Sequence, residues 1–577
     1  MPLSIQEIHP RSLESSYRRE LSEFVNEKAV ERLWSKDMTL WLPAEAAGRY
    51  SANLNWLDLP QRMAEYMPQV VAHAQQLETL GFETVVLVGM GGSNLAADTI
   101  SRMSAATRPR RFIVLDSIDP SALRKLEAQL NWNTTLFVFV SKSGTVIEMH
   151  ALLLYFLEKL RGHGFGQPGR HFIAVTEANS YLAQLAAEYR FFAVFLDPPR
   201  ISGRFSSLIH FGLLLSGIGR VPPEVLSERA IAMQRACASD VEPKNNPALT
   251  LAALLAAGAL DGMDRLFLAA TPSLAAVTRS LAHLLGSSTG KDRQGIVPVF
   301  GEIPSNHERP CDHCMVAVLS LNGEAEDSLE RMAKRLDEKG APSVHIRIEG
   351  PEDLGAELFK WELATVLACS RLGVNPFDQP DAQRSRDAAQ RQIIALATAR
   401  NAPLPTVRVS EPGLELRAES ATRLGISTHT LPESLRTFLE LGSTDGYVAI
   451  MAFLEESAEV SDSLTRLRAQ LEARLAIPVQ LDFGPRYLHS LGQVHKGGPD
   501  KGLFVILTGE PDHDIPVPGA GYTFGRLQIA LANGDFEALH QRNDRVLWLH
   551  LSENVTQGLA QLESSMSSAL ARLRRIA

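Results

Sequence analysis

The apolar residues of this chain recur in short runs that predict buried strands. Five such runs lie between residues 84 and 197, and amphipathic segments of about 10 to 20 residues separate them. The runs are apolar throughout instead of alternating with polar residues, which is typical of strands covered on both faces of a parallel sheet. The expected strands are 84–90, 110–117, 136–143, 171–177 and 191–197. This pattern predicts a doubly wound α/β domain.

The same alternation of strand and helix returns twice further along the chain. A second unit has expected strands at 265–271, 315–321 and 343–349, with helices near 273–286, 325–339, 352–372 and 381–398. A third has expected strands at 446–453, 477–483, 502–509 and 545–551, a helix at about 460–475 and a closing helix. The predicted fold class is therefore α/β, with two doubly wound parallel-sheet domains and a third, C-terminal α/β domain.

The spacing of these elements predicts domain boundaries. Leu13, Tyr17, Leu21 and Phe24 follow helical spacing before the first sheet begins, and a Pro-containing stretch precedes the third unit. We expect an N-terminal helical arm at 1–60, a first sheet domain at 61–225, a second at 226–399, a linker at 400–415 and a C-terminal domain at 416–577.

Composition narrows the class of protein. The chain has 577 residues and a formal net charge of −9, which argues against nucleic-acid binding. Four Cys are too few for a disulfide framework and favour the cytoplasm. The N-terminal residues show no signal peptide, and the longest apolar run, 248–260, falls short of the roughly 20 residues that a membrane span needs. We expect a soluble cytoplasmic protein without a membrane partner.

A glycine-rich loop, Gly89–Asn94, follows the first predicted strand. Glycines at a strand-to-helix turn let backbone amides approach an anion at a helix N-terminus. A dinucleotide site is one interpretation, supported by Asp116 after the next strand, but Asn94 stands where the third glycine of that fingerprint belongs. A tight turn that needs glycine only for packing is another.

A second loop, Ser141–Glu148, also joins a predicted strand to a helix. It carries three hydroxyls (Ser141, Ser143 and Thr145) and a glycine. Hydroxyl and amide donors at a helix N-terminus suit a phosphate monoester. The alternative is a helix that begins with Ser or Thr as its N-cap. Because a cap needs one hydroxyl and not three, phosphate binding is favoured.

Together these loops resemble the sugar-isomerase (SIS) fold and, within it, the glucose-6-phosphate isomerase family. Further stretches match in the family's order: Ser202–Ser206 (SGRFS), Ser288–Lys291 (STGK), Gly295–Val299 (GIVPV), Val374–Pro380 (VNPFDQP), Gly484–Ser490 (GPRYLHS) and Gly492–Pro499 (GQVHKGGP). The last two look like the isomerase half of fused transaldolase–isomerase proteins. No transaldolase barrel fits in the roughly 60 residues before the first sheet.

This resemblance implies an aldose–ketose isomerase that interconverts glucose 6-phosphate and fructose 6-phosphate through an enediol. It implies a hexose 6-phosphate substrate, no metal or other cofactor, a homodimer, and a place in glycolysis and gluconeogenesis. The implied phosphate ligands are Gly92, Ser93, Ser141, Lys142, Ser143 and Thr145. Arg204 would stabilise the enediolate, since its guanidinium group is planar and permanently charged.

The chain departs from the family at its acid and base positions. Where the family has a glutamate base before STGK, this chain has Ser287, and serine is no base near neutral pH. The family's Glu and Lys after NPFDQP fall on Gln383 and Arg386. The ring-opening histidine is matched only approximately by His495, with His489 nearby. The catalytic candidates are therefore Arg204, which keeps the family residue, His495, whose stretch is a near match, and the changed positions Arg386 and Ser287.

These departures leave several hypotheses open. Asp292 or Glu302 could replace the base, or the protein could bind sugar phosphate without turning it over. An NAD-dependent oxidoreductase is a third, disfavoured hypothesis. The cluster His307–Cys314 could hold zinc or cycle as a dithiol, but there is no second C-x-x-C and a surface loop is preferred. The sequence does not indicate which hexose phosphate is preferred.

Overall fold

A computed structural model describes residues 3–91, 111–206, 208–209, 222–301, 313–324, 327–398, 404–420, 424, 430–552 and 554–573. The chain divides into two compact units. Unit 1 comprises residues 1–116, 130–303 and 313–378, and unit 2 comprises residues 117–129, 304–312 and 379–577. Residues of both predicted sheet domains thus fall in unit 1, whereas the helix predicted at 381–398 falls in unit 2.

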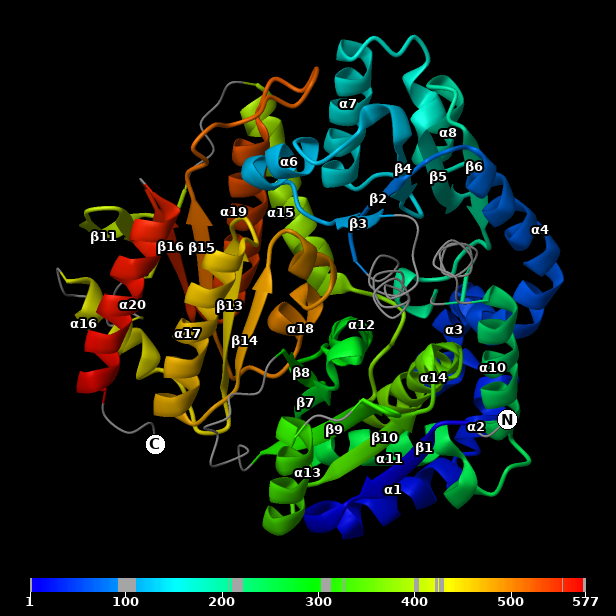
Figure 1. The fold of residues 1–577 in the computed structure, drawn as a ribbon. Helices are drawn as coiled ribbons and strands as arrows, with labels where there is room; N and C mark the ends of the chain where they lie inside the picture. The colour runs from blue at the N-terminus through cyan, green and yellow to red at the C-terminus, as the bar shows by residue number, and fades with distance from the viewer. Residues whose placement is uncertain are drawn as a thin grey trace. The chain divides into compact units, whose positions relative to one another are not determined.

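The first sheet of unit 1 has the strand order β3-β2-β4-β5-β6, and every neighbouring pair is parallel. Its strands are β2 (Thr84–Gly89), β3 (Arg111–Leu115), β4 (Thr135–Val140), β5 (Phe172–Glu177) and β6 (Ala193–Asp197). The central strands β2 and β4 are buried at every position, as continuous apolar runs require. All five strands lie where the sequence predicts them (Figure 1).

The second sheet of unit 1 has the order β1-β10-β9-β7-β8. Its parallel strands are β7 (Arg265–Ala270), β8 (Val297–Phe300), β9 (Cys314–Leu321) and β10 (Ser343–Ile348). The sequence analysis did not predict β1 (Ile5–His9), which pairs antiparallel with β10. The segment expected to be a helical arm therefore begins with an edge strand.

Helices of unit 1 accompany these sheets. They are α1 (Glu14–Asn26), α2 (Ala29–Trp34), α3 (Ala44–Tyr50), α4 (Leu59–Thr79), α7 (Ile147–Gly162), α8 (Tyr181–Glu188), α10 (Pro223–Ala236), α11 (Pro247–Leu260), α12 (Ala275–Thr289), α13 (Asp327–Lys339) and α14 (Leu354–Leu372). The apolar run at 248–260 is the buried helix α11. No helix in the described part of the chain is both long and apolar enough to cross a lipid bilayer.

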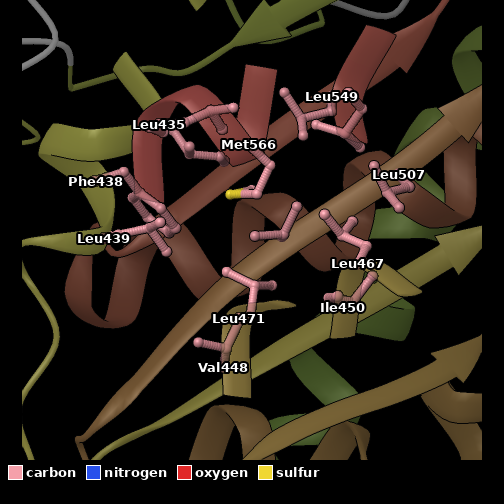
Figure 2. Close-up of a cluster of buried hydrophobic side chains, with 14 of the residues drawn as sticks. Leu435, Phe438, Leu439, Val448, Ile450, Leu467, Leu471, Leu507, Leu549 and Met566 are labelled. Carbon is pink, nitrogen blue, oxygen red and sulfur yellow. The ribbon is translucent and has the colours of Figure 1, made fainter. Parts of the chain in front are cut away.

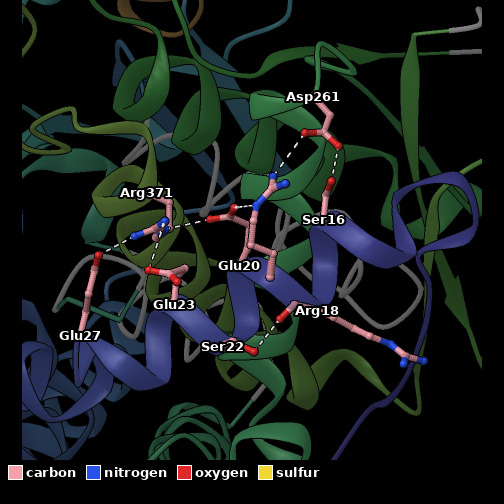
Figure 3. A network of polar contacts seen from close by, with 9 residues as sticks. Ser16, Arg18, Glu20, Ser22, Glu23, Glu27, Asp261 and Arg371 are labelled. Carbon is pink, nitrogen blue, oxygen red and sulfur yellow. Dashed lines mark hydrogen bonds and ion pairs between the residues drawn. The ribbon is translucent and has the colours of Figure 1, made fainter.

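A polar network attaches α1 to the rest of unit 1 (Figure 3). Arg371 on α14 donates to Glu20 over 2.8 Å and to Glu27 over 2.5 Å. Glu20 is only 1% exposed and also accepts from Arg19, which reaches Asp261 directly after α11. The network compensates the cost of burying the Glu20 carboxylate, because a buried charge needs charged partners.

The sheet of unit 2 has the order β11-β12-β16-β15-β13-β14. Its parallel strands are β13 (Tyr447–Phe453), β14 (Val479–Phe483), β15 (Gly502–Gly509) and β16 (Val546–Leu551). A hairpin of β11 (Val407–Glu411) and β12 (Leu414–Arg417) extends it through antiparallel pairing of β12 with β16. This hairpin occupies most of the segment expected to be a linker.

Unit 2 also contains helices. They are α6 (Pro120–Glu127), α15 (Pro380–Ala397), α16 (Leu431–Leu439), α17 (Ala458–Leu475), α18 (Gly492–Gly497), α19 (Phe524–Asn543) and α20 (Val555–Arg572). Figure 2 shows the core in which α16, α17 and α20 cover one sheet face, with Phe438, Leu467 and Met566 facing Ile450 and Leu549. Helices α16 and α19 were not predicted.

Candidate phosphate and sugar site

The hydroxyl-bearing loop lies at the carboxyl end of β4 in unit 1. Ser141 is nearly buried, its backbone amide donates to the Val175 carbonyl over 3.1 Å, and its Oγ accepts from the Gly144 amide over 3.1 Å. Ser143 and Thr145 are exposed, and their hydroxyl oxygens lie 2.8 Å apart. Ser141 thus holds the loop, while the other two hydroxyls face solvent together.

Helix α7, which follows this loop, begins after a residue without a polar side chain. Its N-cap is Val146, whose side chain cannot accept a hydrogen bond from the first-turn amides. The alternative in which Ser or Thr is the N-cap is therefore wrong. The N-terminus of a 16-residue helix carries partial positive charge, which attracts an anion. The exposed hydroxyls directly before it suit a phosphate group.

Lys142 has a different environment from its neighbours. Its ammonium group donates to the Ile201 carbonyl, and burial lowers its pKa, with Asp197 and Glu177 opposing the effect. Asp197 ends β6 and is itself buried, which raises its pKa to about 7 although Lys142 lowers it. Lys142 therefore braces the backbone beside the loop as well as carrying charge near it.

The glycine-rich loop is described only at its beginning. Gly91 has a φ of 88°, the left-handed conformation that glycine adopts easily. The predicted phosphate ligands Gly92 and Ser93 lie outside the described residues.

Arg204 connects two of the predicted motifs within unit 1. It lies in the short 3₁₀ turn Gly203–Phe205 and is 7% exposed. Its Nη2 donates to the carbonyls of Pro376 over 2.8 Å and Asp378 over 3.3 Å, both in the VNPFDQP stretch. The guanidinium is thereby fixed in place, as a preorganised charge for a transition state must be.

Ser287 and the STGK stretch lie at the end of α12, close to the same arginine. Ser287 is fully buried, and its carbonyl accepts from Lys291 Nζ over 3.4 Å. The Ser288 carbonyl accepts from the same nitrogen over 2.6 Å, and a carboxylate oxygen of Asp378 lies 3.7 Å away. Burial, and next the charge of Arg204, lower the pKa of Lys291 to about 8.

Sequence reasoning did not select Lys291 as a functional residue. It selected Asp292 and Glu302 as possible replacements for the missing base. Asp292 is exposed, and Glu302 lies outside the described residues. The position of Lys291 in STGK, a polar turn directly after an apolar helix, was the available signal, but burial of a lysine cannot be read from one sequence.

Two predicted catalytic residues, Arg386 and His495, belong to unit 2. Arg386 is exposed on α15, and its Nε and Nη2 donate to Gln383 Oε1 over 3.0 and 2.8 Å. The two residues that stand at the family's Lys and Glu positions thus bond to each other. An arginine in this state remains a cation and is no proton donor at neutral pH.

His495 on α18 is 2% exposed and packs near the rings of Tyr447, Tyr487 and Phe504. Its Nε2 lies 2.8 Å from Gln480 Oε1. Burial, followed by the charge of Lys496, lowers its pKa to about 3, so the ring is neutral at neutral pH. This environment argues against His495 as a ring-opening acid. His489 is partly exposed in the turn before α18.

The rest of the GQVHK stretch stabilises unit 2. Gln493 accepts from the amides of Asp381 and Ala382 over 3.1 and 3.0 Å and so caps α15. Lys496 pairs with the fully buried Asp535, which also accepts from Tyr487 and Ser385. Burial alone would raise the pKa of Asp535, but the Lys496 ammonium holds it below its usual value.

The predicted metal or dithiol cluster is described only in part. Residues 302–312 lie outside the described residues, and Cys314 is buried at the start of β9. Elsewhere in the described ranges, no three His, Cys, Asp or Glu side chains are grouped to hold a metal ion.

The mainly parallel sheets of unit 1, with helices between their strands and the hydroxyl-bearing loop after β4, define an α/β fold. A crystal structure of a hypothetical protein from Thermus thermophilus has this fold at a TM-score of 0.59 and 21% identity, covering 67% of this chain and 100% of that one. Residues 55–292 match the family model of phosphoglucose isomerase. Within these residues the chain is similar to the glucose-6-phosphate isomerase family.

Curated relatives support this similarity at low identity. A probable glucose-6-phosphate isomerase from Haloarcula marismortui is 27% identical over 357 residues, which are 55% of this chain and 79% of the relative. A glucose-6-phosphate isomerase from Leptospira biflexa is 26% identical over 403 residues, which are 61% of this chain and 88% of the relative.

Proposed function

We propose that this protein interconverts glucose 6-phosphate and fructose 6-phosphate. The observation that carries the proposal is the exposed hydroxyl pair of Ser143 and Thr145 directly before the N-terminus of α7, in a chain whose residues 55–292 match the phosphoglucose isomerase family model. Hydroxyls and helix amides together can bind the phosphate of a hexose without a metal. By the family resemblance we also propose a homodimer that acts in the cytoplasm in glycolysis and gluconeogenesis.

The reaction moves a proton between C1 and C2 of the open-chain sugar and develops negative charge on an oxygen. Arg204 is suited to stabilise that charge, because its guanidinium is permanently charged and is already hydrogen-bonded to two backbone carbonyls. Ser141 and Gly144 shape the phosphate loop, and Ser143 and Thr145 bind the phosphate. His495 is buried and neutral, so ring opening is not assigned to it or to any other residue of unit 2.

A second candidate is a sugar-phosphate-binding protein without turnover. The buried Ser287 at the base position and the exposed Arg386, engaged with Gln383, favour it. Both candidates require the phosphate loop, so binding alone cannot separate them.

Coupled turnover of fructose 6-phosphate to glucose 6-phosphate separates the candidates. The unchanged protein should run beside Arg204→Ala, Ser287→Glu and Arg235→Ala, the last an exposed arginine of unit 1 that serves as the control. Isomerase activity that Arg204→Ala lowers at least a hundredfold and Arg235→Ala leaves unchanged would support the isomerase. Saturable binding without turnover, with activity gained in Ser287→Glu, would support the binding protein instead.

A further inference from the structure

A buried cationic pair lies beside the vacant base position of unit 1. Lys291 is 3% exposed, and Arg204 is close enough to act on its charge. The carboxylate of Asp378 lies 3.7 Å from Lys291, and 47% of that side chain is exposed, so the cluster reaches the surface. Among the described residues, Cys369 is a further titratable neighbour of Lys291. It is fully buried, and burial raises the pKa of its thiol to about 12.

The backbone directly after Lys291 adopts uncommon conformations. Asp292 and Arg293 both have positive φ, 53° and 66°, which is uncommon for residues other than glycine. Gly295, at φ 122°, lies so close to α12 that a Cβ there would stand 2.3 Å from the Thr289 carbonyl oxygen. Strain of this kind persists only where the surrounding structure enforces it, and it is concentrated at functional sites.

We propose that the amine of Lys291 transfers the proton between C1 and C2, the step for which position 287 offers no base. This inference rests on the proposed isomerase function. The neutral amine takes a proton from C1 of open-chain fructose 6-phosphate, so that a C–H bond breaks, an N–H bond forms and the electron pair moves to O2 as an enediolate. The ammonium then returns the proton to C2, the O1 proton passes to O2, and C1 becomes the aldehyde carbon.

Arg204 and Lys291 have complementary roles in this scheme. The arginine cannot lose its proton and stabilises the enediolate oxygen. Burial, together with the charge of Arg204, lowers the pKa of Lys291 to about 8, while the charge of Asp378 opposes that effect. About a tenth of the lysine is therefore neutral at pH 7, which a general base needs.

A lysine at the end of a helix can have a purely structural role as a C-cap. Lys291 Nζ donates to the Ser287 and Ser288 carbonyls near the end of α12, as such a cap does. A C-cap requires only a cation, so an arginine at position 291 would keep that role. A general base must be able to lose its proton, so an arginine at position 291 could not act as the base. The substitution Lys291→Arg therefore separates the two roles.

The test compares Lys291→Arg with Lys244→Arg, a change of the same type at an exposed lysine of unit 1. If Lys291 is the base, Lys291→Arg lowers turnover by about 10²–10⁴-fold. It also abolishes exchange of the C1 deuterium of labelled fructose 6-phosphate with solvent, while affinity for fructose 6-phosphate by calorimetry stays within about threefold. Turnover within tenfold of the unchanged protein would overturn the inference and leave the isomerase proposal standing.

The pH profile of the unchanged protein provides a test that needs no variant. Measured between pH 7 and 9.5, above the phosphate pKa of about 6, turnover at saturating substrate should rise to a plateau with a midpoint near 8. A flat or falling profile would overturn the role of Lys291. Absence of turnover at every pH would overturn the isomerase proposal, and the inference with it.

Discussion

Gly144 and Leu182 touch so closely that no side chain fits between them. A Cβ built on Gly144 would lie 2.2 Å from the backbone nitrogen of Leu182, and Gly144 has a φ of 72°. The glycine lets the loop after β4 fold against the start of α8 and keeps Ser143 and Thr145 in place. The geometry of the phosphate loop thus depends on one residue without a side chain.

We predict that Gly144→Ala weakens binding of fructose 6-phosphate at least tenfold, because the loop must move to admit the methyl group. Calorimetric titration measures this. Gly164→Ala is the matched control, since Gly164 has a φ of 88° but nothing within 4 Å of its Cβ position. Both variants carry the cost of about 1–2 kcal/mol for a left-handed alanine. Equal affinities in the two variants would show that the contact with Leu182 is unimportant for the site.

The hydroxyls of Ser141 and Thr145 should affect binding in the same direction. Replacing both with Ala removes the loop's internal acceptor and one exposed donor, so we expect affinity for fructose 6-phosphate to fall strongly, by more than tenfold. Thr79→Ala, at an exposed hydroxyl on α4 of the same unit, should leave affinity unchanged. Unaltered affinity of the double variant in calorimetry would remove the main support for both proposed functions.

Arg371 should contribute far more to stability than Arg18. Arg371→Ala leaves the buried Glu20 with Arg19 as its ion-pair partner, and we expect the free energy of unfolding to fall by about 3 kcal/mol. Arg18→Ala breaks an exposed pair with Glu14 and should cost about 0.5 kcal/mol or less. Urea denaturation followed by circular dichroism measures both. Similar losses in the two variants would contradict the importance we give to burial.

Acid should destabilise unit 2 through His495. Its pKa is about 3 when folded and about 6.5 when unfolded, so the unfolded state binds more protons between these values. The resulting stability is complete above pH 6.5 and is lost as the pH falls toward 3, by at most about 1.4 kcal/mol per pH unit. His495→Gln should flatten the dependence of urea midpoint on pH between 7 and 4, whereas His513→Gln, at an exposed site, should not. An unchanged slope in His495→Gln would refute this account.

The parallel strands could be predicted because a strand buried on both faces appears in the sequence as a continuous apolar run. The run at 84–90 becomes β2 at Thr84–Gly89, with every position buried. Edge strands lack such a run. β1 is half polar and finds its partner more than 300 residues away, and β8 contains Pro298, which an edge strand tolerates because one side needs no hydrogen bonds.

The sequence motifs of the site could be predicted, but the burial and contacts of its side chains could not. The sequence places hydroxyls before a helix but cannot say that Val146, with no side chain to cap the helix, is its N-cap. The sequence marks His495 as a candidate. The burial that makes its ring neutral depends on Tyr447 in β13 and Phe504 in β15, which lie elsewhere in the sequence. Burial of Lys291 follows likewise from tertiary packing.

The pairing of β1 with β10 affects the order in which this protein can fold. Residues Ile5–His9 are synthesised before their partners at Ser343–Arg347, which follow more than 330 residues later. Until β10 is made, β1 has no partner strand and its backbone groups stay unpaired. Completion of the second sheet of unit 1 therefore requires contacts between segments far apart in the chain, which slows folding because a long loop must close.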